Sequence, residues 1–283
     1  MNFNRCTRAC LTKIICAICF LIPVSTNAQS NSDSNALLVI GSSYVNGTTR
    51  IDDNGIAALN GLAVGLGSFF SLGDALVRNK KLNGLVVNEA AVGSTTIDRV
   101  SCLLYLCLEG GKMFGYMSQF DNALKRVAIY NPNNFGEIIG YNAKYLLIDA
   151  PNDCIHSDAF GIPQSVTYFC TDEEINASAD RIIEVANKAL SLGITPIVTI
   201  PPKYRDLDLS LVQQNLNLYW VVDEYNYNKI RKTYKVRFHD ELPNAVVVDI
   251  WRKFVHIGDG IHPNRKTVMR AARKLSKIIN QIN

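Results

Sequence analysis

The sequence lacks an excess of charge of either sign, and this excludes one large class of partners. Charged residues make up 19% of the 283 residues, with 29 Lys and Arg against 25 Asp and Glu. Three of the basic residues lie within residues 1–28, so the rest of the chain carries 26 basic and 25 acidic side chains. Because a near-neutral domain offers no electrostatic footprint to a phosphate backbone, we expect no nucleic-acid partner.

Motifs for cofactors and metal ions are absent as well. The sequence contains neither a GxGxxG nor a P-loop pattern. His156, His239 and His256 show none of the paired spacing that metal ligands require. We therefore expect no cofactor and no metal ion.

Long apolar runs are also rare, and the most prominent one lies at the N-terminus. Ile14–Val24 follows Arg5, Arg8 and Lys13 and precedes small residues that end at Ala28. This order predicts a secretory signal peptide over residues 1–28, followed by a single domain over 29–283 and a secreted or periplasmic location. The run is shorter than the roughly 20 apolar residues that span a bilayer, so we expect no stable membrane insertion after cleavage. An uncleaved N-terminal anchor is the alternative.

Four of the eight cysteines lie in the predicted leader, and the other four are Cys102, Cys107, Cys154 and Cys170. An even number of cysteines in an exported chain indicates disulfides, and four cysteines allow three pairings. The two local pairings, Cys154–Cys170 and Cys102–Cys107, each close a loop within one long connection, and we predict these. Four free buried thiols are the alternative.

Short apolar runs alternate with helical patterns along the chain. The five runs are nearly continuous in apolar residues, which is typical of strands buried on both faces: Ala36–Ile40, Leu85–Asn88, Tyr145–Ile148, Pro196–Ile200 and Ala245–Ile250. The predicted helices are Ile56–Arg78, Met117–Ile129, Thr171–Leu192, Leu209–Tyr234 and Arg265–Ile279. This alternation predicts a doubly wound, three-layer α/β/α fold with a five-stranded parallel sheet of flavodoxin-like type. Ser101–Gly115 and Cys154–Cys170 are predicted as long connections.

Residues suited to catalysis follow four of the predicted strands, at the edge where open α/β sheets bind ligands. They are Ser43 after the first run, Gly93 after the second, Asn152 after the third, and Asp259 with His262 after the fifth. Each has an ordinary structural explanation when taken alone: a helix cap, a turn glycine, an Asx turn and a solvated histidine. Taken together, these residues suggest one shared site, because each of them follows a predicted strand of the same sheet.

In the order of these residues along the chain, the sequence resembles the SGNH hydrolases, which are also called GDSL esterases and lipases. The residues that match the four blocks of that family are Gly41, Ser43 and Gly47, then Gly93, then Asn152 and Asp153, then Asp259, His262 and Pro263. Two positions depart from the family pattern: Ser42 stands where an Asp is usual, and Ala150 stands where a Gly is usual.

The resemblance implies a secreted serine esterase that hydrolyses acyl or acetyl esters. Ser43 would be the nucleophile, His262 the base and Asp259 its orienting partner, while Ser43, Gly93 and Asn152 would form the oxyanion hole. O-acetylated glycans, lipid esters and small esters are all open as substrates. A non-catalytic carbohydrate-binding protein on an SGNH scaffold is the alternative, and Ser42 in place of Asp is its support.

Overall fold

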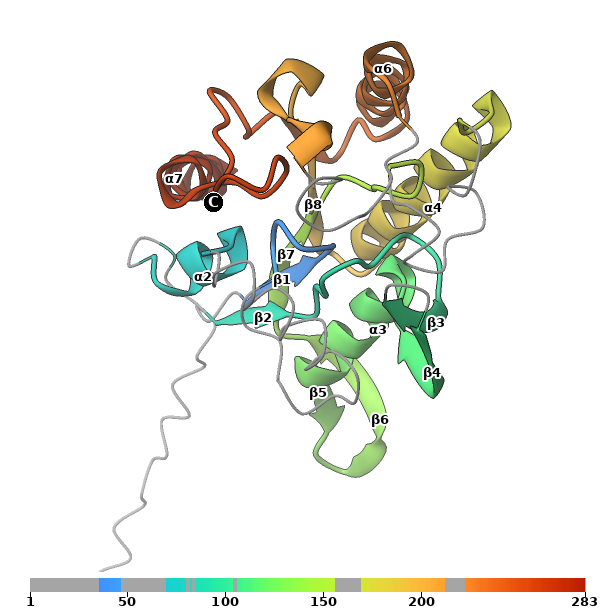
Figure 1. Ribbon diagram of the computed structural model, residues 1–283. Helices are drawn as coiled ribbons and strands as arrows, with labels where there is room; N and C mark the ends of the chain where they lie inside the picture. The colour runs from blue at the N-terminus through green and yellow to red at the C-terminus, as the bar shows by residue number, and fades with distance from the viewer. Residues whose placement is uncertain are drawn as a thin grey trace, which may run out of the picture. The chain divides into compact units, whose positions relative to one another are not determined.

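A five-stranded, fully parallel sheet forms the centre of the fold (Figure 1). The computed structural model describes residues 36–46, 70–79, 82, 85–103, 106–155, 169–211 and 222–282, with only the backbone of 101–111. The strands, in the spatial order β2-β1-β7-β8-β9, are β2 (Val86–Asn88), β1 (Ala36–Ile40), β7 (Ala143–Ile148), β8 (Thr195–Thr199) and β9 (Val246–Val248). Each lies at one of the five predicted runs, so the predicted sheet is confirmed. The predicted signal peptide, residues 1–28, lies outside the described residues.

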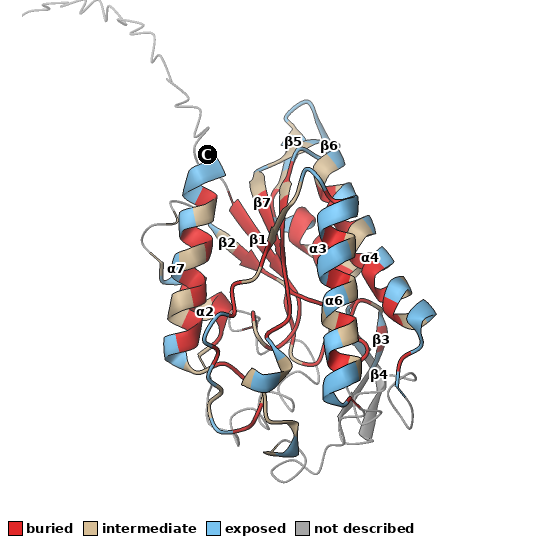
Figure 2. Ribbon diagram, turned by 90° about the horizontal axis from the view of Figure 1, so that it is seen from above, coloured by how far each residue is buried: buried red, intermediate tan, exposed pale blue. Residues whose placement is uncertain are grey.

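Helices cover both faces of this sheet (Figure 2). One face carries α2 (Leu72–Val77) and α7 (Arg265–Ile282), and the other carries α3 (Tyr116–Arg126), α4 (Asp172–Ser191) and α6 (Glu224–Glu241). Successive residues of β1 point to opposite faces: Leu37 and Val39 join the core beneath α2 and α7, while Leu38 and Ile40 join the core on the other face. The predicted three-layer α/β/α fold is confirmed, and two apolar faces explain why the strand sequences are continuously hydrophobic.

Helix α4 begins and ends where its sequence predicts. The Thr171 side chain accepts a hydrogen bond from the Glu174 N–H, and the Glu174 side chain accepts one from the Thr171 N–H, which forms a capping box. The chain turns away at Gly193, whose φ of +74° is a left-handed conformation that glycine adopts without strain.

The predicted helix Leu209–Tyr234 is wrong in its extent. Val222 and Asp223 are not helical, and α6 starts only at Glu224 and continues to Glu241. The reason is local, because the Asp223 side chain accepts the Asn226 N–H at 2.8 Å and caps a new helix. Of the predicted helix Ile56–Arg78, the described part is α2, where Ser71 and Asp74 form a capping box.

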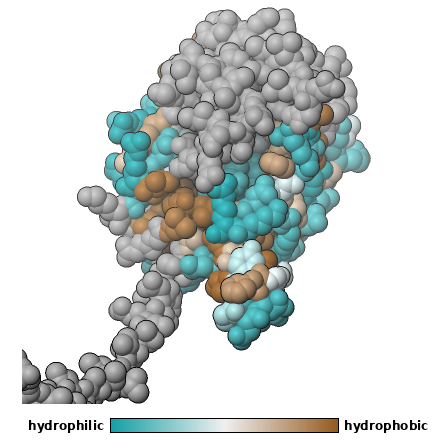
Figure 3. Space-filling view, turned by 90° about the horizontal axis from the view of Figure 1, so that it is seen from below, coloured by the Kyte–Doolittle hydropathy of each residue, from teal (hydrophilic) through white to brown (hydrophobic). Residues whose placement is uncertain are grey.

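Two antiparallel hairpins were not predicted. β3 (Arg99–Leu103) pairs with β4 (Leu106–Met113) and overlaps most of the predicted connection Ser101–Gly115, and β5 (Ala128–Asn131) pairs with β6 (Asn134–Tyr141) ahead of β7. The β5–β6 hairpin protrudes from the edge of the sheet where the parallel strands begin (Figures 2 and 3). Its large exposed side chains are Ile129, Tyr130, Phe135, Ile138 and Ile139.

Candidate active site

The turn after β1 holds Ser43 in a tight and buried loop. The Val45 and Asn46 N–H groups both donate to the Ser42 carbonyl, at 3.2 and 3.0 Å. Gly41 opens the turn with φ +144°, and a Cβ at this position would lie 2.4 Å from Cβ of Asp149. Only glycine therefore allows β1 to turn this close to the end of β7.

The two neighbouring serines have different surroundings. A hydrogen bond joins the side chain of Ser42 to that of Tyr116 on α3. Ser43 is 8% exposed and lines a cavity with about 510 Å³ of empty space. Apart from Asn152 and Asp149, the cavity is lined largely by apolar side chains, including Ile155, Leu207 and Ile261.

Asp259 and His262 form a buried pair in the loop between β9 and α7. Nδ1 of His262 lies 2.5 Å from Oδ2 of Asp259, and both residues are under 10% exposed. The other carboxylate oxygen of Asp259 accepts the backbone N–H groups of Ile261 and His262, at 3.0 and 2.9 Å. Burial raises the pKa of Asp259, but these hydrogen bonds and the charge of His262 outweigh it and hold the pKa below its usual value.

The loop that carries this pair is held by a second histidine. Nδ1 of His256 accepts the N–H groups of Gly258 and Gly260, at 3.1 and 3.3 Å. The backbone also closes on itself, because the Ile257 N–H donates to the His262 carbonyl at 2.9 Å. His256 is therefore a structural residue of this loop.

Aromatic packing connects the Asp259–His262 pair to the serine turn. The Tyr44 ring meets the His262 ring edge to face, with centroids 6.2 Å apart, and it packs on Trp251 at 5.2 Å in the same manner. Ile261, directly before His262, lines the same cavity as Ser43. The turn after β1 and the loop after β9 thus meet at one end of the sheet, as predicted from their positions in the sequence.

The loop after β2 is bonded to the serine turn from the other side. The Asn88 side chain donates to the Val45 carbonyl at 2.8 Å and accepts the Ala90 N–H at 2.9 Å. Gly93 in this loop has φ +77°, and its carbonyl accepts a hydrogen bond from the Arg99 guanidinium. The described residues that line the cavity include Ser43 and Asn152 but do not include Gly93.

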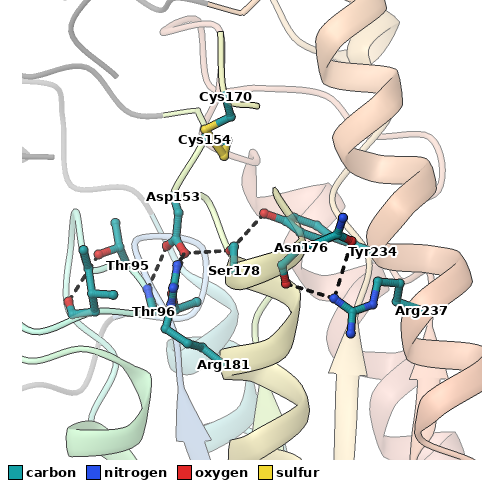
Figure 4. Close-up of polar contacts among 11 residues, drawn as sticks. Thr95, Thr96, Asp153, Cys154, Cys170, Asn176, Ser178, Arg181, Tyr234 and Arg237 are labelled. Atoms are coloured by element: carbon teal, nitrogen blue, oxygen red, sulfur yellow. Dashed lines mark hydrogen bonds and ion pairs between the residues drawn. A yellow bond between two sulfur atoms is a disulfide. The ribbon is translucent and has the colours of Figure 1, made fainter. Parts of the chain in front are cut away.

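Asp153 joins the loop after β2 to the loop after β7 (Figure 4). Its carboxylate, which is almost fully buried, accepts the Thr96 N–H at 2.8 Å and the Ser178 hydroxyl at 2.6 Å. Arg181 of α4 forms an ion pair with Asp153 at 3.0 Å, and Tyr234 of α6 donates to Ser178 at 3.0 Å. Asn152 and the Gly93 loop are thus held to each other and to α4.

The predicted disulfide Cys154–Cys170 is confirmed, with a Cα–Cα distance of 5.6 Å. It begins one residue after Asp153 and ends one residue before the N-cap of α4 (Figure 4). For the second predicted pair, the register of β3 and β4 sets Cys102 opposite Cys107. Their side chains lie outside the description, so this disulfide stays a prediction.

Three polar residues at the site were missed from the sequence. Gln119 of α3 is 1% exposed, accepts the Gly41 N–H at 2.8 Å and donates back to the Gly41 carbonyl at 3.2 Å. Asp149 directly follows β7 beside the serine turn, and Thr199 donates its hydroxyl to Asp149 at 3.1 Å. Burial raises the pKa of Asp149 to about 7, although hydrogen bonds from Thr199 and from the Ala150 and Ser42 N–H groups lower it in part.

Within the described ranges no group of three or more His, Cys, Asp or Glu side chains could hold a metal ion. None of the helices described there is both long enough and apolar enough to span a bilayer.

No family model and no curated relative matches the sequence, but solved structures match the fold. One is Est24, a carbohydrate acetylesterase from Sinorhizobium meliloti, at 13% identity and a TM-score of 0.51, with 88% of this chain and 100% of that chain covered. Another is an aryl esterase from M. smegmatis in its inhibitor-bound form, at 12% identity and a TM-score of 0.50, with 88% and 100% covered. At these identities the likeness is one of fold, and it agrees with the SGNH-type fold that the resemblance implied.

Proposed function

We propose that this chain is an exported serine esterase of the SGNH type that hydrolyses carboxylic esters. The observation that carries the proposal is the buried Asp259–His262 pair, which contacts Tyr44 directly beside Ser43. A carboxylate on Nδ1 fixes the imidazole tautomer and leaves Nε2 to act as a base.

In the proposed reaction, His262 removes the proton of the Ser43 hydroxyl as the serine oxygen attacks the ester carbonyl. The C–O bond of the ester then breaks, His262 returns the proton to the departing alcohol, and the acyl group stays on Ser43. Water, deprotonated by His262, then attacks the acyl carbon, the bond to the Ser43 oxygen breaks, and His262 gives the proton to that oxygen as the acid leaves. Asp259 stays ionised throughout and stabilises the imidazolium, which is consistent with its lowered pKa.

The developing oxyanion would be held by the Ser43 and Gly93 N–H groups and by the Asn152 side-chain amide. Two features support this assignment. Asn152 lines the cavity beside Ser43, and Asp153 ties its loop to the Gly93 loop through Thr96. A hole built from two bonded loops has fixed donors, which is what stabilisation of a transition state requires.

The acyl group would occupy the apolar cavity beside Ser43. The apolar side chains of Ile155, Leu207 and Ile261 that line this cavity suit the hydrocarbon part of an acyl group. The fold likeness to a carbohydrate acetylesterase and to an aryl esterase fits small acyl esters.

Export is part of the proposal. The N-terminal pattern of residues 1–28 supports a cleaved signal peptide and a secreted or periplasmic enzyme. The Cys154–Cys170 disulfide supports the same location, because disulfides persist in oxidising compartments.

The test compares Ser43→Ala with Ser42→Ala in labelling by a fluorophosphonate probe and in hydrolysis of p-nitrophenyl acetate. Ser43→Ala should abolish labelling and lower kcat on the order of 10⁴-fold or more, as loss of a triad member does. Ser42→Ala should still label, because the Ser42 side chain bonds to Tyr116 on α3. If the folded wild-type protein fails to label, the catalytic proposal is wrong and the carbohydrate-binding alternative takes its place.

A further inference from the structure

Trp251 separates the acyl cavity from a second cleft. This residue, 1% exposed, lines both spaces, and the second one has about 1230 Å³ of empty volume that is shared with open solvent. The walls of the second cleft come from the loops after β8 and β9 and from α6. It therefore opens beside the proposed acyl site, at the same end of the sheet.

The second cleft is strongly basic. Five exposed cations line it: Lys203, Arg205, Lys235, Arg252 and Lys253. None of the ion pairs between described residues involves these five. A sixth cation, Arg231, is neutralised by Asp249 at 2.7 Å and donates to the Pro201 carbonyl at 2.9 Å. Asp206 is the remaining acid in the lining.

This concentration of charge stands out against the rest of the chain. Beyond residue 28 the sequence is nearly neutral, whereas the cleft lining carries six cations and two carboxylates. A concave wall of one sign concentrates ligands of the opposite sign.

The backbone that presents two of these cations is fixed in a strained conformation. Lys253 has φ +55°, and it alone among the described non-glycine residues has a positive φ. The Arg270 guanidinium donates to both the Arg252 and the Lys253 carbonyls at 2.7 Å and so holds this turn. Strained residues held in this way cluster at ligand-binding sites.

The wall between the two spaces also carries a hydrogen-bond donor. The Trp251 ring is fixed between Tyr44 and Phe254, with centroids at 5.2 and 6.0 Å. Its Nε1 is buried and has no hydrogen-bond partner among the described residues. A buried N–H without an acceptor is unfavourable.

We propose that this basic cleft binds the anionic group of the substrate's alcohol moiety, so that the substrates are short acyl esters of acidic glycans. The ester would lie over Ser43 with its acyl group in the apolar cavity, and a carboxylate or phosphate on the sugar would reach past Trp251 to the cations. This inference rests on the proposed esterase function for its catalytic part, while the anion site itself does not depend on catalysis.

Binding is tested without catalysis through tryptophan fluorescence. The chain has two tryptophans, so Trp220→Phe leaves Trp251 as the reporter. Trigalacturonate should give a saturable signal that 0.5 M NaCl suppresses, and maltotriose, which is neutral, should give none. Displacement by inorganic phosphate more readily than by acetate would identify a phosphate-bearing glycan, and the reverse a uronate. Equally tight binding of an oligothymidylate of the same charge would overturn the assignment to glycans.

Activity provides the second arm. The quantity measured is kcat/KM on acetylated polygalacturonate divided by kcat/KM on acetylated dextran. Exposed charge contacts are each worth about 1.4-fold to 5-fold, so Arg205→Gln/Arg252→Gln should lower this ratio about 5-fold. The matched control is Arg273→Gln/Lys277→Gln on exposed positions of α7, which removes the same charge and should leave the ratio unchanged.

The two proposals can fail separately. A wild-type protein that binds trigalacturonate but does not hydrolyse p-nitrophenyl acetate would keep the anion site and refute the esterase. A wild-type protein that hydrolyses both acetylated polymers equally, with no effect of the Arg205/Arg252 change on the ratio or on binding, would refute the anion site.

Discussion

Replacing Asp149 by Asn should make the protein more resistant to unfolding as the pH rises. Asp149 is 2% exposed, directly follows β7 beside the serine turn and accepts the Thr199 hydroxyl at 3.1 Å. Burial raises the pKa of this carboxyl from 3.8 to about 7, against the hydrogen bonds that favour the charged form. An Asn side chain has nearly the same shape and keeps an acceptor oxygen for Thr199.

The direction follows from proton linkage. Between about pH 4 and pH 7 the unfolded chain releases the Asp149 proton while the folded chain keeps it. The stabilising contribution of the protonated carboxyl is complete below pH 4 and is lost as the pH rises through the folded pKa of about 7. Each pKa unit is worth about 1.4 kcal/mol, so the loss amounts to about 4 kcal/mol by pH 8. The Asn side chain of the Asp149→Asn variant does not titrate, so this variant does not lose that part of its free energy of unfolding as the pH rises.

Urea unfolding at half-unit steps from pH 4 to pH 8.5 measures this difference. The free energy of unfolding of Asp149→Asn minus that of the wild type should rise with pH at up to about 1.4 kcal/mol per unit. Asp240→Asn is the control, because Asp240 is exposed on α6 and its carboxyl meets similar solvent in both states. A difference that stays flat, or falls with pH, would mean that Asp149 is ionised in the folded protein and that the argument from burial is wrong.

Four further predictions concern the proposed catalytic machinery. His262→Ala should be about as inactive towards p-nitrophenyl acetate as Ser43→Ala, with no further loss in the double variant, and an additive loss would show independent roles. Asn152→Ala should lower kcat on the order of 10²-fold with little change in KM, and a pure KM effect would mean that Asn152 only binds substrate. Asp153→Asn should lower the free energy of unfolding by about 3 kcal/mol and lower kcat more than KM, while an unchanged kcat would leave Asp153 a purely structural role. Cys154→Ser should cost about 3 kcal/mol of stability and also lower kcat, and full activity in the folded variant would confine the disulfide to stability.

The strands and the positions of the proposed catalytic residues could be predicted because both follow from local sequence. A strand buried on two faces is apolar at every position, as in Ala36–Ile40, and the chemistry follows where such a run stops. The capping box of Thr171 and Glu174 likewise lies within four residues of sequence.

The hairpins could not be predicted in the same way. The side chains of β5–β6 are mostly exposed, so no burial pattern marks these strands, and they are defined by backbone pairing between segments that meet only after the turn. For helix α6 the error was an element predicted to begin too early. Helix-compatible residues continue across the cap at Asp223, so only the structure reveals where the helix begins.

The buried polar residues around the site were missed for a third reason. Gln119 accepts the Gly41 N–H, 78 residues away, and Asp149 accepts the Ser42 N–H, 107 residues away. A polar residue on an amphipathic helix or after a strand looks solvent-exposed in the sequence. Only tertiary packing determines that its partner is a backbone N–H at the far side of the site.

The position of the β5–β6 hairpin has a practical consequence. It enters β7 from the edge of the sheet where the parallel strands begin, whereas Ser43 and His262 follow the opposite ends of β1 and β9. A tag or surface linker placed in its turn at Asn133 would hold the protein with the proposed substrate cleft facing away from the support. The hairpin is thus a suitable attachment point for immobilising the protein on a surface. Acetylated polymers that are too large to diffuse into a matrix could then still reach Ser43.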